Sequence, residues 1–439
     1  MRVRRSGSPP RTRPAPFRAL RVRNYRLFFV GQILSVIGTW TQNTAIAWIV
    51  LQGRESSVDL GAIVALQFLP LLVLGVWAGA IADRTDKPRL LQVTNSVAGI
   101  IALATALLVS TGHTSLRTLG IMSLLGGVAS AFETPARQTL AAELVRGEDL
   151  PSAVGLNGAI MTSSRLVGTA IAGVLIATVG ATLCLYLNAV SFLAVVVAMQ
   201  LMRRDQFNVV ARSPRGKGQI RQGLRYALGH PEVRVPLAAM AIVGTLAFNQ
   251  QVTTPLLARI TFDAGPGLFA AFGSVGGAGA LLGAITAAAR RQAGAALIGY
   301  AAILLGISAL AVALAPTAAV ALPLLAIMSF GASMYVSATS TRLQHVADPA
   351  FRARVMALNA ILFLGSTPVG SVIVSAVSDA TNPRVAVGLG GVGALGTGLV
   401  VWRRGARRHT GTHGDLAGGP AGAGSDAGAR LDVAVKSEG

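Results

Sequence analysis

Apolar stretches recur along the whole chain and are separated by short turns rich in Gly, Pro and Asp. A stretch of about 20 apolar residues is long enough to cross a bilayer as an α-helix. We expect twelve such spans, at residues 24–52, 57–82, 89–112, 115–142, 152–179, 181–202, 234–260, 264–289, 293–315, 317–345, 353–379 and 383–402. The pattern therefore predicts an all-α polytopic membrane protein with twelve transmembrane helices.

One connection between the predicted spans is long. Residues 203–233 are basic and polar, and within them we expect a short amphipathic helix at Gln219–Leu228. This linker divides the spans into an N-terminal bundle of six helices, 24–202, and a C-terminal bundle of six, 234–403. Each half thus has the size of one bundle in a transporter built from two repeats.

The two halves also share short sequence similarities, and each is flanked by a tail. Leu156-Asn157 matches Leu358-Asn359, and Gly168 matches Gly370 at the same offset, which favours an internal duplication. Residues 1–23 form a basic tail, which we expect to be cytoplasmic. Residues 404–439 are rich in Gly, Ala and Asp, a composition typical of a disordered tail.

The composition agrees with a membrane protein and excludes a soluble one. Of the 439 residues 52% are apolar and only 13% are charged, and the mean hydropathy is +0.60. The net charge of +21 lies in the tails and in alternate turns without interleaved aromatic residues, so we expect no nucleic-acid partner. The positive-inside rule then predicts a multi-pass protein of the cell membrane with both termini cytoplasmic. The turns predicted on the other side contain only Arg54, Arg117, Arg259 and Arg384.

Several kinds of chemistry have no counterpart in the sequence. The single Cys184 and five scattered His offer no disulfide and no metal site, and no phosphate-binding loop indicates ATP as energy source. No nucleophile, His and acid form a recognisable set of catalytic residues. We therefore expect no enzyme, no cofactor and no metal.

The turn after the second span has a distinctive order of small and charged residues. It reads Gly79-Ala-Ile-Ala-Asp83-Arg84-Thr-Asp86-Lys87. A Gly at 79 allows helices to approach closely, and Asp83 at the helix end could pair with the N-terminus of a neighbouring helix. An ordinary basic turn explains the same residues equally well.

This turn resembles the signature Gly-x-x-x-Asp-Arg-x-Gly-Arg-Lys of the major facilitator superfamily, with Asp86 in place of the central Gly. The chain is similar to the drug:proton antiporter branch that includes siderophore (enterobactin-type) and macrolide exporters. The similarity covers residues 17–403 and includes Phe17–Leu20, Asn24-Tyr-Arg26, Gly31-Gln32, Ala153–Asn157, Ser164–Gly168 and Leu187–Ala189. The family's Gly-Pro-x-x-Gly-Gly element reads Gly168–Gly173 here and lacks the Pro.

The resemblance implies two six-helix bundles around a central cavity that opens alternately to either side. In the family, the Asp of this turn is thought to latch the cytoplasmic face against the eleventh helix. On that basis Gly79, Asp83 and Arg84 are candidate gating residues.

Charged residues inside the predicted spans are few, and each is costly unless it is paired or hydrated. Glu133 and Arg137 lie four residues apart and so face the same way on a helix. They form either a proton-titrating site or a fixed ion pair. Arg165 has no acidic residue in its own span, which favours an anion or carboxylate partner in the cavity.

Polar residues also gather on the first helix of each half. Gln42 and Asn43, with Trp40 and Trp48, could line a substrate path, although the Trp residues could equally be interfacial anchors. Asn249 and Gln250 lie at a comparable place on the seventh span. Lipid offers no hydrogen-bond partner, so these side chains must face protein or water.

Together these features predict a secondary active transporter that exports a small amphipathic molecule, such as a drug, siderophore or secondary metabolite, by proton antiport. Its partners would be that small-molecule substrate, protons and the lipid bilayer, and we expect a monomer. Uptake or lipid movement by the same fold, and a non-transporting membrane sensor or scaffold, remain alternatives.

Overall fold

The computed structural model describes residues 17–54, 56–204, 207, 219–289 and 295–414. In this part of the chain twelve helices are long and apolar enough to cross a membrane, as the hydrophobic pattern predicts. The predicted tails at 1–16 and 415–439, and linker residues 208–218, lie outside the described residues.

The first bundle consists of six long helices after one short turn of 3₁₀-helix. These elements are η1 (Arg18–Arg21), α1 (Arg23–Arg54), α2 (Ser57–Arg84), α3 (Lys87–Ser110), α4 (Leu116–Glu143), α5 (Leu150–Thr178) and α6 (Ala181–Leu201). Ser56, Asp86 and Ser115 begin α2, α3 and α4, because their side chains accept a hydrogen bond from the third N–H beyond them.

The second bundle begins with the linker helix and contains one interrupted span. Its elements are α7 (Gln219–Gly229), α8 (Pro231–Ala247), α9 (Gln250–Leu256), the π-helical η3 (Leu257–Thr261), α10 (Pro266–Ala289), α11 (Ala295–Leu314), α12 (Ala318–Val346), α13 (Arg352–Ala380) and α14 (Pro383–Gly414). Residues 404–414, which the composition predicts to be disordered, continue α14.

The span predicted at 234–260 is present as Pro231–Thr261, but its helix is interrupted. The helix is broken between α8 and α9, where Phe248 and Asn249 have ψ angles of 22° and 36° instead of helical values. Pro255 in α9 also removes a backbone donor from this stretch. Discontinuous helices recur at the binding sites of membrane transporters, because their free backbone groups face a protein-lined space.

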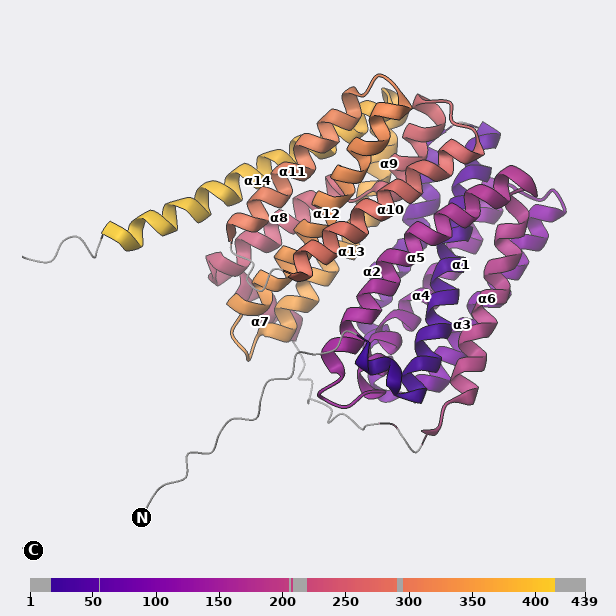
Figure 1. Ribbon diagram of the computed structural model, residues 1–439, viewed down its shortest axis with the longest axis horizontal. Coiled ribbons are helices and arrows are strands. Elements are labelled where there is room, and N and C mark those ends of the chain that lie inside the picture. Colours follow the sequence, from indigo (N-terminus) through magenta and orange to yellow (C-terminus); the bar gives the residue numbers. More distant parts are fainter. Residues whose placement is uncertain (1–16, 55, 205–206, 208–218, 290–294, 415–439) are drawn as a thin grey trace, which may run out of the picture.

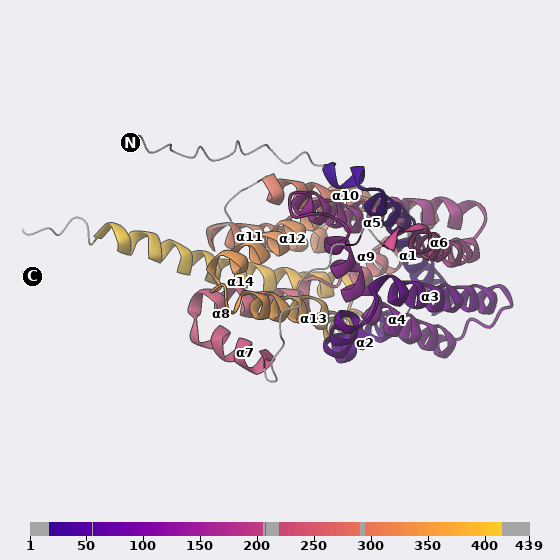
Figure 2. The same cartoon turned by 90° about the horizontal axis from the view of Figure 1, so that it is seen from below.

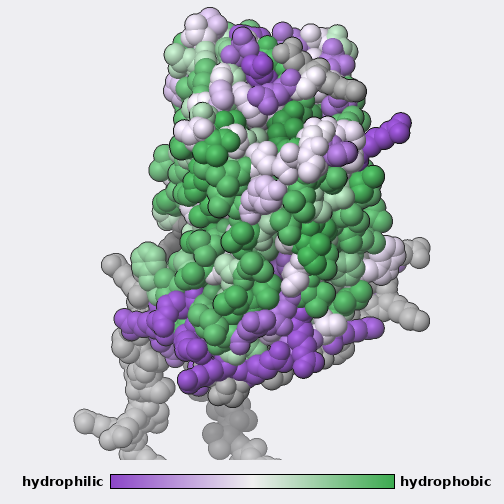
Figure 3. Space-filling model, turned by 90° about the vertical axis from the view of Figure 1, so that its right-hand side faces the viewer, coloured by the Kyte–Doolittle hydropathy of each residue, from purple (hydrophilic) through white to green (hydrophobic). Residues whose placement is uncertain are grey.

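The two bundles stand side by side with their helices running in roughly the same direction (Figures 1 and 2). We call the end where η1, α7 and the C-terminal end of α14 lie the tail end, and the other end the opposite end. The surface between the two ends is mostly apolar, and hydrophilic residues form a band near the tail end (Figure 3). This distribution suits a protein surrounded by lipid at mid-height.

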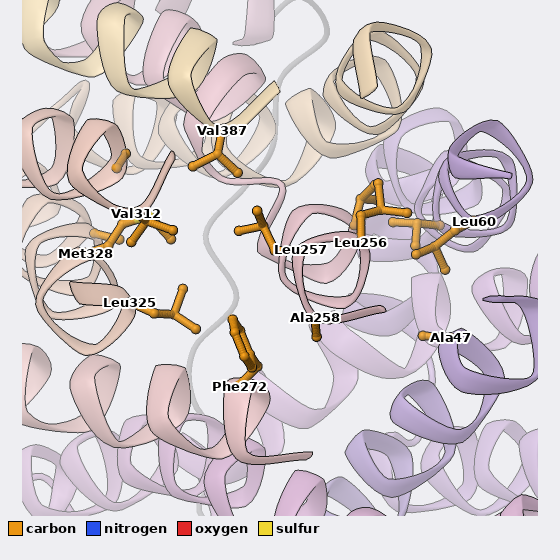
Figure 4. Close-up of a cluster of buried hydrophobic side chains, with 14 of the residues drawn as sticks. Ala47, Leu60, Leu256, Leu257, Ala258, Phe272, Val312, Leu325, Met328 and Val387 are labelled. Carbon is orange, nitrogen blue, oxygen red and sulfur yellow. The ribbon is translucent and has the colours of Figure 1, made fainter. Parts of the chain in front are cut away.

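The buried apolar residues form one core shared by both bundles and two that are not shared. The first-bundle residues of the shared core lie toward the opposite end, including the end of α1 and the start of α2, and they join α9, η3 and α10 of the second bundle. Within the second bundle this core continues along α11 and α12 as far as Ile298 and Ala338. Figure 4 shows Leu60 of the first bundle beside Leu256 of the second. At the tail end, one separate core contains only residues of 19–207 and the other only residues of 227–355, so each bundle there packs within itself.

Polar contacts hold the helices of the first bundle together at the tail end. The Asn24 side chain donates to the carbonyl of Arg203 at 2.7 Å and accepts from its N–H at 3.1 Å, which ties the start of α1 to the end of α6. The Tyr25 hydroxyl donates to the carbonyl of Ala153 on α5 at 2.9 Å. Arg18 forms an ion pair with Asp149 at 2.7 Å. The sequence Phe17–Arg26 thus holds α1, α5 and α6 together.

The linker helix α7 attaches to the second bundle. Its Tyr226 ring stacks on Phe351 with ring centroids 4.4 Å apart, and the Tyr226 hydroxyl accepts the N–H of Asp348 at 3.0 Å. Both partners belong to the turn between α12 and α13. The predicted helix at Gln219–Leu228 is therefore present, and it packs on the tail end of this bundle.

Candidate functional site: the interface between the two bundles

The bundles are joined by hydrogen bonds at the opposite end. The N–H of Ser57, at the start of α2, donates to Asp379 Oδ1 at the end of α13, with a distance of 3.2 Å. The hydroxyls of Ser57 and Ser378 lie 3.1 Å apart. Both serines are buried, so this contact is closed to water.

Trp48 of α1 adds an aromatic contact at the same end. Its ring meets Phe269 of α10 edge-on at 5.1 Å, and the guanidinium of Arg259 lies 5.7 Å from its centroid. Trp48 is buried between the bundles. In this conformation it is therefore not exposed as an anchor at the membrane interface, which was one of the two roles expected from its sequence position.

Glycines show how far along the interface the bundles touch. A Cβ atom built on Gly61 of α2 would meet the Ser375 side chain of α13, and one built on Gly173 of α5 would meet Ala270 of α10. Nearer the tail end, Cβ atoms built on Gly75 and Gly79 of α2, or on Gly155 of α5, meet nothing within 4 Å. Gly79 thus makes no close helix contact in this conformation.

Arg165 lies midway along α5, at the boundary between the bundles. Its guanidinium carbon is 5.3 Å from the centroid of the Trp40 ring on α1. Among the described residues the guanidinium has neither a carboxylate within ion-pair distance nor a hydrogen-bond acceptor. The residue is only partly exposed.

A polar group of the second bundle lies next to Arg165. Ser329 Oγ on α12 and Arg165 Nη2 lie 3.3 and 3.9 Å from the point that a Cβ atom would occupy at Gly276 of α10. Ser329 Oγ donates to Gln250 Oε1 at 3.5 Å, and the Gln250 Nε2 atom is buried without a partner. Three helices, α5, α9 and α12, thus bring polar side chains together beside Gly276 of α10.

The other amides expected to line a path are largely used within the bundles. Gln42 Oε1 accepts from Asn188 of α6 at 2.8 Å, and Asn43 Oδ1 accepts from Gln67 of α2 at 3.3 Å. Both side chains remain partly exposed. Asn249 is buried, donates to the carbonyl of Thr245 at 2.7 Å and packs on Gly370 of α13.

Glu133 and Arg137 form an ion pair on α4. Arg137 Nε lies 3.3 Å from Glu133 Oε1, as the spacing of four residues leads one to expect. The Arg137 side chain also approaches the sulfur of Met161 on α5 at 3.5 Å. The pair lies on a different helix from Arg165 and does not neutralise it.

The charged turn after α2 holds the first bundle together at the tail end. Asp86 accepts the N–H of Arg89 and binds Arg204, at the end of α6, at 2.8 Å. Lys87 is buried and pairs with Glu143 of α4 at 2.8 Å. Asp83 is half-buried and Arg84 is exposed. The Asp at 86, which departs from the family signature, thus has a structural role of its own.

Sequence reasoning singled out Arg165 and Gln250 but missed Ser329, Gly276, Ser57 and Asp379. Asp379 could have been found from the sequence, because it is an acidic residue at the end of an apolar span. No feature of the sequence distinguishes Ser329. The described residues contain no group of His, Cys, Asp and Glu side chains suited to a metal ion.

Comparison with solved structures identifies the fold. The chain resembles a bacterial homologue of the human lysosomal transporter Spinster, solved in an inward-facing and unoccupied conformation, with a TM-score of 0.65 over 94% of this chain and 99% of that one at 15% identity. It also resembles the nucleoside transporter NupG, with a TM-score of 0.69 over 86% and 98% of the two chains at 11% identity. At such identities the resemblance to these two structures shows the fold alone.

Relatives with higher identity are also transporters. The staphyloferrin A transporter of Staphylococcus aureus is 34% identical over 178 residues, which are 40% of this chain and 45% of that protein. The multidrug efflux pump Tap of Mycolicibacterium fortuitum is 25% identical over 351 residues, 77% and 85% of the two chains. The chain thus spans less than half of the first relative and most of the second.

A family model matches nearly the whole chain. The model described as transmembrane secretion effector matches residues 14–411, which include all twelve spans and both bundles. This match agrees with the fold, with the similar transporters and with the signature turn at Gly79–Arg84. The chain belongs to the transmembrane secretion effector family of the major facilitator superfamily.

Proposed function

We propose that this protein is a secondary active transporter, not an enzyme, that exports a small amphipathic molecule by alternating access in exchange for protons. The observation that carries the proposal is the asymmetry of the apolar cores. One core joins the bundles at the opposite end, whereas each bundle has its own core at the tail end. Two bundles that part at one end and meet at the other are what one state of an alternating-access cycle requires.

The direction in which this state faces follows from the distribution of charge. The tail end carries Arg18, Arg89, Arg203 and Arg204, among other basic residues, and basic residues concentrate on the cytoplasmic side of membrane proteins. We therefore assign the tail end to the cytoplasmic face of the cell membrane, with both termini on that side. The structure then represents a state closed to the outside.

Individual residues have distinct proposed roles in this cycle. The gating residues would act when the tail ends of the bundles close, because they lie at the tail end of α2; they are Gly79, Asp83 and Arg84. Glu133, paired with Arg137, would exchange the proton. Gln42, Asn43, Asn249 and Gln250 would line the path together with Arg165.

One of the two relatives described above is an efflux pump, which supports export. One is a multidrug efflux pump and the other a siderophore transporter, and both kinds of cargo are small molecules. We extend to this chain only the class of cargo, a small molecule with polar and apolar parts. We propose that one chain suffices as the working unit.

Everted membrane vesicles provide the test. They would be energised to an acid interior, with a pH-sensitive dye reporting the gradient, and a panel of antibiotics, dyes and siderophores would be added. Export by proton antiport predicts that a substrate releases protons from vesicles containing the wild-type protein and not from vesicles without it. Accumulation of a compound without proton release would contradict antiport. If no compound is transported, export is contradicted and the alternatives of uptake or a sensor role are favoured.

A further inference from the structure

Two Arg residues at the interface lie over Trp rings of α1, but only one of them has a counter-charge. Arg259 lies over Trp48 and forms an ion pair with Asp263 at 2.8 Å. Arg165 lies over Trp40, and no residue in the described part of the chain offers it an acceptor. A lone guanidinium midway along a membrane span is costly, so residues of this kind usually mark a functional site.

The side chains around Arg165 contribute further donors. Gln250 is 7% exposed, and its amide has one end bound to Ser329 and the other without a partner. Whichever way the amide is turned, one of its two polar atoms stays unsatisfied. A buried polar atom of this kind costs free energy until a ligand or water completes it.

The absence of a side chain at Gly276 lets α10 approach this group closely, because a Cβ atom there would lie tightly against Ser329 Oγ. Ser329 Oγ and Arg165 Nη2 both lie within 4 Å of the position of a Cβ atom there. The guanidinium can only donate, and it presents its N–H groups in a fork that matches the two oxygens of a carboxylate. The Trp40 ring beneath it offers a flat apolar surface to the rest of a ligand.

We propose that Arg165 and Gln250, whose amide is oriented by Ser329, form an oxyanion subsite that binds a carboxylate group of the transported molecule, with Trp40 against its apolar part. The inference rests on the proposed transport function and narrows its substrate class to molecules that carry a carboxylate. The bound carboxylate neutralises Arg165 and accepts from Gln250 Nε2, and Gln250, held by Ser329 of α12, brings the second bundle to the same ligand. Substrate thus contacts both bundles at once, which couples its binding to their relative movement.

Arg137 does not offer the same site, although it also lies within a span. Its charge is balanced by Glu133 on its own helix, and its side chain is 10% exposed. Glu133 in turn is held by Arg137, so Arg165 takes no counter-charge from α4.

The test is equilibrium binding to the full-length protein in lipid nanodiscs, without any gradient. The probes are radiolabelled naphthalene-1-acetate and the uncharged naphthalene-1-acetamide, and empty nanodiscs correct for partition into lipid. We expect saturable binding of the acid that is at least about tenfold tighter than binding of the amide, because a hydrogen bond to a charged group carries such a factor. Arg165→Gln should remove this preference, and Arg165→Lys should restore part of it.

The matched control is Arg259→Gln, which removes the other Arg over a Trp ring and leaves only the highly exposed Asp263 unpaired. It should bind the acid as the wild type does. Equal affinity for acid and amide, no saturable binding of the acid, or an equal loss in Arg259→Gln would each overturn the subsite. If Arg165→Gln fails to fold, the preference of the wild type for the acid over the amide, and its partial retention in Arg165→Lys, still test the subsite. Carboxylate binding without proton exchange would instead contradict only the antiport proposal.

Discussion

The N–H of Ser57, at the start of α2, donates a hydrogen bond to Asp379 Oδ1, at the end of α13, across the boundary between the two bundles. The carboxylate thus lies at the positive end of the α2 dipole, where a negative charge is favourable. Beside it the hydroxyls of Ser57 and Ser378 are 3.1 Å apart. These contacts must break when the bundles part at this end, so they are suited to hold the observed state.

A disulfide across this contact should lock the transporter. In a Cys184→Ala background, Ser57→Cys with Ser378→Cys should cross-link on mild oxidation, because the hydroxyl separation lets two sulfurs approach to about 2 Å. The cross-link should abolish transport in the vesicle assay, and reductant should restore it. Each single Cys variant with oxidant is the control. Full transport by the cross-linked protein would mean that this end never opens.

Asp83→Asn should weaken transport without lowering the amount of protein in the membrane. The proposed role of Asp83 is to pair with a helix N-terminus when the tail end closes, an interaction worth about 0.3–1 kcal/mol and up to about 2 kcal/mol in buried geometry. We therefore expect transport to fall about two- to fivefold, and by up to about thirtyfold if the interaction is buried. Transport rate and protein abundance, the latter by immunoblot, are measured on the same vesicles. An equal fall in both would make Asp83 a folding residue.

Glu133→Gln tests the proposed proton site. The variant keeps the shape of the side chain but cannot carry a negative charge, so proton release should cease while downhill exchange of substrate continues. The measurement is transport rate against pH in both proteins, where the wild type should vary and the variant should not. Glu148→Gln, which changes a carboxylate that is 77% exposed at the tail end, serves as the control. Superimposable profiles would remove Glu133 from coupling.

The buried pair of Lys87 and Glu143 should be important for stability. Their side chains are 8% and 17% exposed, and removing one partner of such a pair costs about 3–5 kcal/mol, because the other charge is left buried. We therefore expect Lys87→Met to lower the melting temperature in detergent clearly. Arg89→Gln, at a side chain 72% exposed, should cost at most about 1 kcal/mol. A stability of Lys87→Met equal to that of Arg89→Gln would contradict this account.

Sequence features that act over short distances along the chain determined much of the fold. The number of spans follows from apolar length alone, and the starts of α2, α3 and α4 follow from Ser56, Asp86 and Ser115 as caps. The ion pair of Glu133 and Arg137 also follows, since residues four apart share a helix face. Each of these features depends on neighbours within one or two helical turns.

The tertiary structure alone decided which polar side chains are already satisfied. Gln42 and Asn43 have partners on α6 and α2, whereas Arg165 has none in the part of the chain that the structure describes, although all three are polar residues within spans. A partner for each could have come from any of the other helices, so spacing along the chain carried no information about it. The break after α8 and the burial of Trp48 between the bundles depend on packing in the same way. The chain alone thus determined the twelve membrane-spanning helices, and their packing determined which charge has no counter-charge among the described residues.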